Sequence, residues 1–433
     1  MKLTTENEDD RIHIMDDDVN STELINQLTL NGTINQEDPF YIFNIGDIIK
    51  KHQNWIEKMP RVAPYYAVKC NDNDVVLATL ALLGTSFDCA SKGEMSKVLS
   101  LGVKPDRIIF ANPAKSKSAL MFAKMMGIKM MTFDCEIELQ KIKTLYPDAS
   151  LVLRIVCEAE IAQCALGKKF GCDPLTEAPK LLKAAKQMGL NVVGISFHVG
   201  SGCKDYPVYN KAIRFCRDLF DEAKGLGFEL SVVDIGGGFP GDNDKDIDEV
   251  SMIVNDSLER YFPDERVQVI AEPGRYYVAS AFTLVTNIFS KKNIMNQATN
   301  EPDRMMLYLN DGVYASFNCL LYDHQVVKPI LLKKSNHHEK KIKSTIFGPT
   351  CDALDEIISD IELPLATDVG DFMFFENMGA YTLPVASPFN GFPLPKIFYF
   401  IERALLEEWF VLPIEGEDYV QDFIGKTIDC NSV

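Results

Sequence analysis

The stretch PYYAVKCNDNDVVLATLALLGTSFDCA, residues 64–90, has the pattern of a strand, a helix and a second strand. In the run 64–69, residues 65–68 are apolar, aromatic and β-branched, as strand residues are, and 86–90 is the second candidate strand. Between them, residues 73–84 have the length and apolar content of a helix and end at a glycine, which commonly stops helices. This order is the unit from which parallel sheets with helical crossovers are built.

The same alternation continues along the chain. It contains eight candidate strands, at 64–69, 86–90, 107–112, 128–134, 151–156, 192–199, 230–236 and 267–273. Helical patterns lie between them, and several end in glycine. The sequence therefore predicts an α/β fold with a (β/α)8 barrel of the TIM type, and a doubly wound open sheet is the alternative.

Beyond residue 280 the pattern changes to strand-like runs joined by loops, such as AFTLVTNIFS (281–290) and DFMFFEN (371–377). The polar stretches 291–304 and 333–343 are expected to be exposed loops, and IERALLEEWF (401–410) a helix. These runs predict a C-terminal, mainly antiparallel β domain.

Four segments follow from these patterns. We expect an acidic, disordered N-terminus at 1–37, the barrel at 38–280, the β domain at 281–410 and an acidic tail at 411–433. The first strand, at about 38–45, fits either the barrel or the β domain.

The composition narrows the class of partner. The chain has 433 residues and a formal net charge of −18, which argues against nucleic acid or an anionic membrane as a partner. It has neither an apolar run long enough for a membrane span nor the basic and apolar start of a signal peptide. Its 11 cysteines lack paired spacing, so we expect reduced thiols and a cytoplasmic location.

Polar residues gather at the expected carboxyl ends of the barrel strands, where enzymes of this fold place their chemistry. They are Lys69, Asp88, Arg154, His198, Ser201, Glu272 and Arg275, and the candidates Pro273 and Gly274 lie between the last two. A buried ammonium is costly unless it is paired, neutralised or used covalently. Lys69 is therefore a candidate for chemistry, and a lysine that simply reaches solvent from the strand end is the alternative.

A phosphate site is predicted at the loops after the seventh and eighth strands. The glycines 236–238 of DIGGGFPG (234–241) let backbone N–H groups approach an anion, and Arg275 could clamp the same phosphate. The alternative is a tight turn. A phosphate site with a strand-end lysine suggests pyridoxal 5'-phosphate, whose aldehyde forms a Schiff base with lysine. Glu272 would hold the pyridinium nitrogen; alternatively, it is an ion-pair partner of Arg275. His198 would lie against the ring; alternatively, it is a histidine packed in the core.

A second group of candidates lies far along the chain. GPTCD (348–352) contains Cys351 and Asp352, and LYDH (321–324) contains Tyr322 and Asp323. The turn composition of GPTCD favours a presented thiol over a packed one, and two aspartates suit an ammonium group. HHE at 337–339 has no other candidate ligands nearby, so no metal is expected.

Several motifs together resemble the eukaryotic ornithine decarboxylases, which are fold-type III enzymes with a barrel and a β domain. They are YYAVKCN (65–71), FDCAS (87–91), SFHVGSGC (196–203), DIGGGFPG (234–241), AEPGRYYVASAFTL (271–284), NDGVY (310–314), FNCLLYDH (317–324), GPTCD (348–352) and FENMGAYT (375–382). The resemblance runs in order from about residue 38 to about residue 400. One small departure is Ala315, where the family often has glycine.

The resemblance implies a role for each matching residue. The Schiff-base lysine is Lys69, the ring-nitrogen partner Glu272, and the residue stacked on the ring His198. The phosphate-binding set is Ser201, Gly236, Gly237, Gly238, Arg275 and Tyr381. The resemblance further implies that Asp323 and Asp352, with Tyr322, receive the distal amine of L-ornithine, and that Cys351 supplies a proton to the decarboxylated carbon.

The resemblance also implies partners. The family forms a homodimer in which the GPTCD loop of one subunit completes the site whose lysine belongs to the other. Residues 115–134 align with the region that binds the inhibitory protein antizyme, with basic residues only partly alike. Two other functions stay open: an inactive antizyme-inhibitor-like homologue, and a decarboxylase of lysine or another basic amino acid.

Overall fold

A computed structural model of the chain describes residues 12–15, 21–30, 37–164, 166–242, 245–333 and 340–409. The chain divides into two compact units. The barrel unit contains Ile48–Val278, and the sheet unit contains the described residues of Met1–Asp47 and Ala279–Pro413. Among the described helices, none is both long and apolar enough to cross a membrane.

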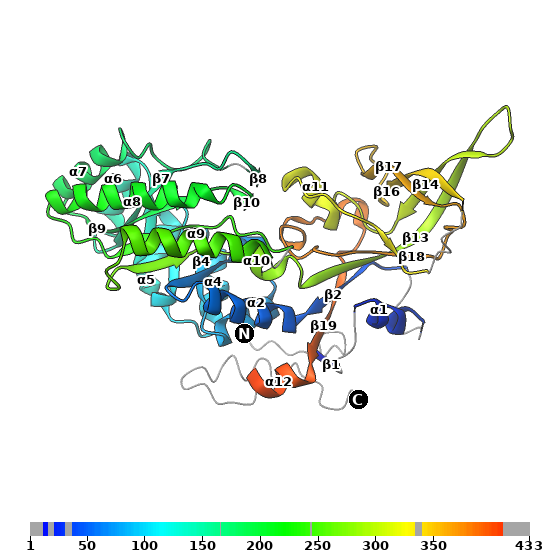
Figure 1. Ribbon diagram of the computed structural model, residues 1–433, viewed down its shortest axis with the longest axis horizontal. Coiled ribbons are helices and arrows are strands. Elements are labelled where there is room, and N and C mark those ends of the chain that lie inside the picture. The colour runs from blue at the N-terminus through cyan, green and yellow to red at the C-terminus, as the bar shows by residue number, and fades with distance from the viewer. Residues whose placement is uncertain are drawn as a thin grey trace. The chain divides into compact units, whose positions relative to one another are not determined.

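Parallel strands close into a barrel in the first unit (Figure 1). In chain order they are β3 (Val62–Ala67), β4 (Ser86–Cys89), β5 (Ile108–Phe110), β6 (Met130–Phe133), β7 (Ser150–Val156), β9 (Asn191–His198), β11 (Val232–Asp234) and β12 (Gln268–Ala271). The ring closes where β12 pairs with β3, with Val269 opposite Val62. The predicted barrel is therefore confirmed, and the alternative of an open sheet is wrong.

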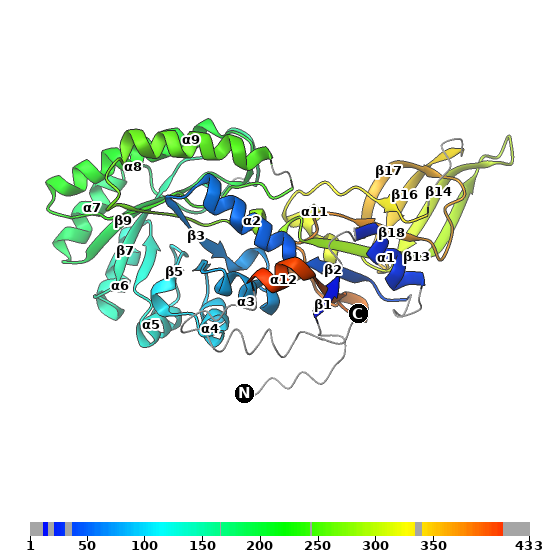
Figure 2. The same cartoon turned by 60° about the horizontal axis from the view of Figure 1, so that its bottom comes forward.

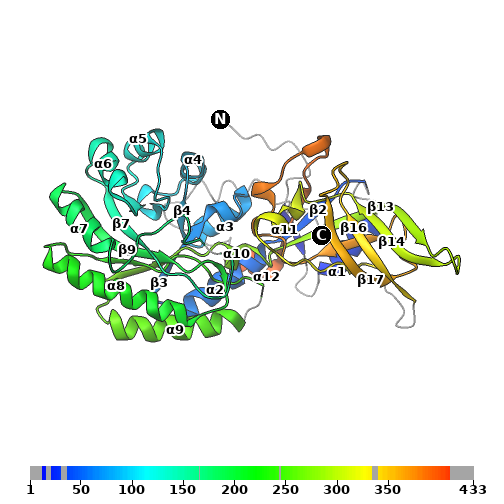
Figure 3. The same cartoon turned by 90° about the horizontal axis from the view of Figure 1, so that it is seen from above.

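Helices follow the strands and surround them (Figure 2). They are α2 (Ile45–Lys58), α3 (Asp74–Leu82), α4 (Lys92–Ser100), α5 (Lys117–Met126), α6 (Glu136–Leu145), α7 (Ala178–Gln187), α8 (Pro207–Gly225), α9 (Lys245–Tyr261) and the short α10 (Arg275–Val278). The two longest, α8 and α9, run side by side along the outside (Figure 3). Their apolar faces cover the strands, which explains the helical periodicity of the sequence.

Apolar side chains fill the barrel. One cluster contains Tyr65, Ile109, Ala111, Val152, Val232 and Ile270 from neighbouring strands. Because parallel strands end at one rim, side chains that follow them lie at the same end of the barrel. One detail differs from the sequence prediction: β3 ends at Ala67, and Lys69 lies in the 3-10 turn η2 (Val68–Cys70).

The sheet unit is built on a mixed, mainly antiparallel sheet, as predicted. Its strands are β1 (Ile12–Met15), β2 (Phe40–Asn44), β13 (Phe282–Met295), β14 (Pro302–Leu309), β15 (Ile330–Leu331), β16 (Lys341–Phe347), β17 (Glu356–Pro364), β18 (Phe372–Phe375) and β19 (Lys396–Glu402). The main path runs β1-β19-β2-β13-β14-β16-β17. The strand predicted near 38–45 is β2, which pairs with β13 and β19 inside this sheet.

Some local predictions differ from the structure. The stretch 291–304 is not a loop, because β13 and β14 continue as a long hairpin with a short turn between them. The N-terminal range 1–37 contains β1 and α1 (Ser21–Leu30), whose Leu24 and Ile25 join an apolar cluster with Phe40. The alternation and polarity of side chains do not reveal such elements, because it is contacts with distant parts of the chain that bury them.

Other local predictions fall partly outside the described residues. The helix expected at 401–410 is α12 (Arg403–Trp409). In the stretch 333–343, residues 341–343 belong to β16. Residues 334–339, which include HHE, lie outside the described residues. The acidic tail at 411–433 lies outside them as well.

Candidate active site

Lys69 forms an ion pair with Asp88 at the carboxyl ends of β3 and β4. The Asp88 side chain is fully buried, whereas the Lys69 side chain is 38% exposed. The second carboxylate oxygen, Asp88 Oδ1, is buried without a hydrogen-bond partner among the described residues. The lysine is thus paired with a buried carboxylate, and part of its side chain is open to solvent.

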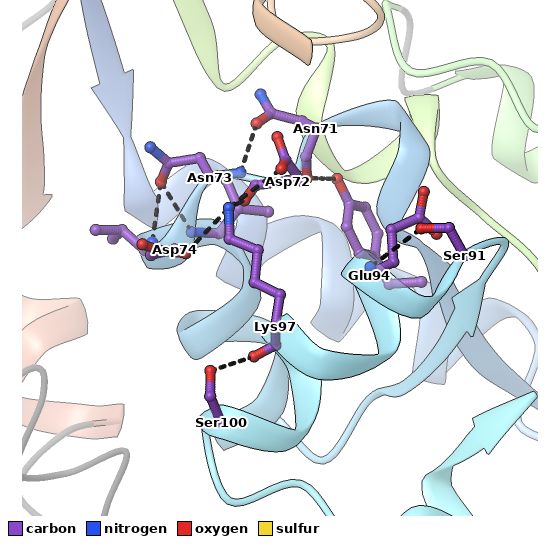
Figure 4. A network of polar contacts seen from close by, with 11 residues as sticks. Asn71, Asp72, Asn73, Asp74, Ser91, Glu94, Lys97 and Ser100 are labelled. Atoms are coloured by element: carbon purple, nitrogen blue, oxygen red, sulfur yellow. Dashed lines mark hydrogen bonds and ion pairs between the residues drawn. The ribbon is translucent and has the colours of Figure 1, made fainter. Parts of the chain in front are cut away.

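The turn after Lys69 is held by a network of polar contacts (Figure 4). The Tyr66 hydroxyl donates to the Asn71 carbonyl at 2.8 Å. The Asn71 side-chain oxygen accepts the Asn73 N–H at 3.1 Å, and the Asn73 side chain caps α3. These bonds fix the backbone that carries Lys69.

Lys97 of α4 completes this network (Figure 4). Its ammonium group lies 3.1 Å from carboxylate oxygens of both Asp72 and Asp74, and it also donates to the Asp72 carbonyl. The helix α4 directly follows β4, the strand that contains Asp88. Lys97 therefore ties this strand and helix to the turn that follows Lys69.

The His198 ring is held in one orientation and one tautomer. The Gly200 N–H donates to His198 Nδ1 at 3.0 Å, so the ring proton of the neutral form is on Nε2. Burial, with the nearby charges of Arg154 and Lys69, lowers the pKa of His198 well below its ordinary value. The ring is therefore neutral at physiological pH.

Buried carboxyl groups gather at the same rim. Glu272 follows β12, and burial together with the charges of Asp234 and Asp88 raises its pKa well above the ordinary value. Burial also raises the pKa of Asp234, at the end of β11, to about 7. Such a group stabilises a cation that is placed beside it, because a positive charge removes the cost of burying the carboxylate.

The loop after β11 forms a close-packed glycine cradle. A Cβ on Gly237 would lie 2.7 Å from His198 Nε2, and one on Gly238, whose φ is +115°, would lie 2.8 Å from the Gly200 carbonyl. The Tyr209 hydroxyl supports the loop by donating to the Gly237 carbonyl at 3.0 Å. Only glycine fits these positions, so the backbone itself lines the site.

A cationic clamp lies next to this cradle. Arg275 Nη2 donates to Ser201 Oγ at 3.1 Å, and Arg275 opens the short helix α10. Ser201 begins the short strand β10 (Ser201–Cys203), which pairs with β8 (Ala162–Cys164). A guanidinium, a hydroxyl and the N–H groups of a glycine backbone are the kinds of donor that suit a phosphate group.

The second set of candidates lies in the sheet unit. Cys351 is exposed in the loop between β16 and β17, and its N–H donates to Asn390 Oδ1 at 3.1 Å. Asp352 accepts hydrogen bonds from the Tyr314 hydroxyl and, at 3.0 Å, from the Leu354 N–H, and these bonds lower its pKa. The thiol is thus presented to solvent beside an ionised carboxylate.

The remaining candidates have distinct surroundings in the same unit. Asp323 is buried directly after α11 (Cys319–Tyr322), whereas Tyr322 is 69% exposed. Tyr381 has a positive φ of 55°, which is uncommon for a residue other than glycine. Such backbone conformations persist where the surrounding structure holds them, and they are frequent at binding sites.

Sequence reasoning missed three residues of these surroundings. Asp234 stands inside the quoted motif DIGGGFPG and directly at a strand end, so its position was a signal that could have found it. Tyr314 ends the quoted motif NDGVY (310–314), so that motif could have found it. Lys97 lies on a helix with no motif of its own, and only the folded chain brings it to Asp72.

The barrel rim defines a class of protein. A strand-end lysine on a buried carboxylate, a neutral histidine, a buried glutamate and a phosphate cradle fit pyridoxal phosphate, and Asp88 Oδ1 is a buried polar atom in need of a partner. The family model "Pyridoxal-dependent decarboxylase, pyridoxal binding domain" matches residues 45–279. The chain belongs to this family of pyridoxal-dependent decarboxylases, and its cofactor is pyridoxal phosphate.

Known proteins are similar over most of the chain. Ornithine decarboxylase of Rattus norvegicus is 47% identical over 404 residues, which cover 91% of this chain and 87% of the relative. Antizyme inhibitor 2 of Xenopus laevis is 44% identical over 390 residues, covering 88% and 84%. The crystal structure of the Paramecium bursaria Chlorella virus arginine decarboxylase bound to agmatine has a TM-score of 0.82 at 34% identity, covering 87% of this chain and 100% of that one.

Replacing Arg275 by alanine is expected to weaken cofactor binding. A hydrogen bond to a charged group contributes roughly 1.5–3 kcal/mol, so the affinity should fall about 10- to 150-fold. Titrating the cofactor-free protein with pyridoxal phosphate and following its absorbance measures this affinity. Arg266→Ala, which removes an exposed arginine paired with Asp264, is the control; an unchanged titration for Arg275→Ala contradicts the phosphate assignment.

Replacing Lys97 by methionine is expected to loosen the turn that carries Lys69. Partly exposed ion pairs contribute up to about 1 kcal/mol, so we expect the cofactor affinity to fall by up to about fivefold. Lys97→Arg should restore it, because arginine keeps the charge. Lys92→Met is the matched control, because Lys92 lies on the same helix without contact to Asp72. Equal effects of the two changes would contradict the prediction, because the loss of one positive charge would then explain both.

Proposed function

We propose that this chain decarboxylates L-ornithine to putrescine, the first step of polyamine biosynthesis. The observation that carries the proposal is the 47% identity to an ornithine decarboxylase over 91% of the chain. The polar residues at the barrel rim support it, because they fit the cofactor on which such a reaction depends.

The residues divide the work of the reaction. Bound pyridoxal phosphate supplies an aldehyde for the substrate's amine and an aromatic ring that accepts the electron pair left by the departing carboxylate. Lys69 would hold the aldehyde end, Ser201 and Arg275 the phosphate, and Glu272 the ring nitrogen. His198, neutral and fixed by the Gly200 N–H, would lie against the ring and exclude water. Cys351 would supply the final proton to carbon.

The sheet unit would provide selectivity for an amino acid with a second, distal amine. Asp352, ionised and oriented by the Tyr314 hydroxyl, suits the distal ammonium of the substrate. Asp323 and Tyr322 are the other proposed contacts to that end, and Tyr381 is a further proposed contact to the phosphate. A distal carboxylate would be repelled by this acidic set, which argues against diaminopimelate as substrate.

We further propose a homodimer. In it, the loop with Cys351 of one copy would complete the site whose Lys69 belongs to the other copy. The proposal is supported by the resemblance of the motifs to those of the eukaryotic ornithine decarboxylases. The exposure of Cys351 also suits this role, because its loop faces away from the core of its own unit. The cytoplasmic location expected from the cysteines stays a prediction.

Antizyme is the second proposed partner. The similarity to antizyme inhibitor 2 of Xenopus laevis supports it. The helix α5, in the aligned region, exposes Met121 and Met125, and large exposed apolar side chains are typical of binding surfaces. Titrating the protein with antizyme while following its sedimentation tests this proposal; an unchanged sedimentation coefficient contradicts it.

The same similarity supports the alternative of an inactive antizyme-inhibitor-like protein. Such a protein would not need the residues that fit the cofactor, yet Lys69, His198 and Arg275 are all present. An absorption band of bound pyridoxal phosphate in the visible range would favour the enzyme. A protein that binds antizyme but gives no such band after incubation with the cofactor would favour the alternative.

The substrate is tested by assaying the purified protein with L-ornithine, L-lysine and L-arginine. Ornithine and lysine differ by one methylene, which typically changes kcat/KM about 10- to 200-fold. We expect ornithine to have the highest kcat/KM and putrescine to be its product. A higher value for lysine or arginine would overturn the substrate and leave the reaction class in place.

A further inference from the structure

The carbonyl groups of the glycine cradle, residues 236–238, are each bound by a donor from another element. The Glu272 N–H donates to the first of them at 2.7 Å, and the Cys203 N–H donates to the third at 2.9 Å. The second, that of Gly237, accepts the Tyr209 hydroxyl at 3.0 Å. Among the described residues, Tyr209 is therefore the only side chain that donates to these three carbonyl groups.

The N–H groups of the same three peptides have no acceptor in the described part of the chain. They belong to Gly237, Gly238 and Phe239, and all three residues are buried. In a trans peptide the N–H points opposite to the carbonyl, so each of these groups points away from the donor that binds its carbonyl. A buried N–H group without an acceptor costs free energy, and three in succession suit an anion that accepts from them.

The backbone conformation of the cradle also favours an anion. Gly236 and Gly238 have positive φ values of 63° and 115°, whereas Gly237 between them does not. A change in the sign of φ between successive residues is typical of the nests in which backbone N–H groups form a concave anion site. The direction of the Gly238 N–H is tied to that of the Gly237 carbonyl, because both belong to one planar peptide. The donor to that carbonyl, Tyr209, therefore controls where this N–H points.

Packing holds the Tyr209 hydroxyl in place. Tyr209 lies in the first turn of α8, and its side chain is completely buried. Its ring contacts Phe197 of β9, with ring centroids 6.3 Å apart, and Phe239 of the loop, with centroids 5.5 Å apart. A Cβ on Gly238 would lie 2.7 Å from the hydroxyl oxygen, so the loop is packed closely against it. Burial raises the pKa of Tyr209 well above its ordinary value, so the hydroxyl keeps its proton and remains a donor.

We propose that Tyr209 is a positioning residue that fixes the peptide between Gly237 and Gly238 so that its N–H faces the phosphate group of the cofactor. The hydroxyl holds the carbonyl on the side of α8, and the N–H on the opposite side becomes a donor to the phosphate. Tyr209 thereby raises the affinity for the phosphate part of the cofactor and leaves that for the aldehyde and the ring unchanged. This inference rests on the assignment of the glycine cradle to the phosphate and is independent of which amino acid is the substrate.

Replacing Tyr209 by phenylalanine removes the hydroxyl and keeps the ring, and this provides the test. We expect Tyr209→Phe to lower the affinity of the full chain for pyridoxal phosphate about 2- to 13-fold, the range for the loss of one neutral hydrogen bond. Its affinity for pyridoxal, which lacks the phosphate, should equal that of the parent protein. Titrating the cofactor-free chain with each compound and following the absorbance of the bound aldehyde measures both affinities.

Inorganic phosphate gives a second measurement that needs no aldehyde. When it competes with pyridoxal phosphate, its inhibition constant should rise in Tyr209→Phe by the same 2- to 13-fold, roughly. The matched control is Ser257→Ala, which removes another buried hydroxyl. Ser257 Oγ accepts the side-chain N–H of Asn210, the residue after Tyr209 on α8, at 2.8 Å, and has no hydrogen bond to the cradle among the described residues. This change should leave all three constants unaltered.

Two results would overturn the proposal. If Tyr209→Phe lost affinity for pyridoxal phosphate and for pyridoxal equally, the hydroxyl would support the packing of the whole site and not the phosphate donors. If its affinity for pyridoxal phosphate and the inhibition constant of phosphate were unchanged, the contact to the Gly237 carbonyl would have no effect on binding. Either result leaves the substrate assay unaffected. The Arg275→Ala titration tests the phosphate assignment separately, so a failure of that assignment is distinguished from a failure of the role of Tyr209.

Discussion

Replacing Lys69 by alanine is expected to abolish covalent attachment of the cofactor and to lower kcat/KM about 100- to 10,000-fold, the range typical for a lost acid–base or nucleophilic group. Lys69 is the lysine at the barrel rim that is both paired with a buried carboxylate and accessible to solvent. The ion pair to Asp88 holds the amine in place, and the glycine cradle and Arg275 would hold the other end of the cofactor.

Borohydride reduction followed by peptide mass spectrometry measures the attachment. We expect the pyridoxyl mass on the peptide that contains Lys69. Lys115 is a built-in control, because burial lowers its pKa to about 8 and makes it a better nucleophile than an ordinary lysine. Its side chain is fully buried against Glu138 at 3.0 Å, so an aldehyde has no access to it. A pyridoxyl mass on another peptide, with none at Lys69, would refute the cofactor assignment.

Replacing Cys351 by alanine is expected to leave cofactor binding intact and to change the product. The thiol is exposed beside Asp352, where it could deliver a proton to the carbon that has lost its carboxylate. Without it the proton would go to the carbon of the cofactor's aldehyde instead; hydrolysis would then release 4-aminobutanal in place of putrescine and leave the amino group on the cofactor, as inactive pyridoxamine phosphate. We expect the rate of putrescine formation to fall about 100- to 10,000-fold, as for other positioned proton donors.

Chromatographic separation of the two products measures this change. Cys135→Ala is the matched control, since Cys135 is also an exposed thiol but lies in the barrel unit before α6. Putrescine at the parental rate, without aldehyde, from Cys351→Ala would remove Cys351 from the reaction. Together with the Lys69 result, the experiment distinguishes loss of cofactor from loss of the proton donor.

The barrel could be predicted from the sequence because its strands are locally encoded. Runs such as 151–156 and 192–199 are mostly apolar, since parallel strands are covered on both faces. Glycines such as Gly127 end the helices between the strands. The rim residues then followed from the rule that strand ends share one side of the barrel. The exact end of β3 did not follow, because Val68 continues the apolar run into a 3-10 turn.

The sheet unit was harder to predict because its pairings are not local. The polar residues of 291–304 form a hairpin whose strands are held by backbone bonds, which side-chain polarity does not reveal. The strand β1 pairs with β19, from the opposite end of the chain, and neither was predicted. Such long-range pairing depends on which surfaces meet after folding.

The order of strands and helices, the lysine at a strand end and the glycine cradle were determined by the sequence alone, because short-range periodicity and backbone stereochemistry specify them. The contacts among side chains distant in the chain were decided only by the tertiary structure. The pairing of Lys97 with Asp72 and of Tyr314 with Asp352 appears when separate elements pack. Their effects arise from burial and the low dielectric of the interior, which no local pattern contains.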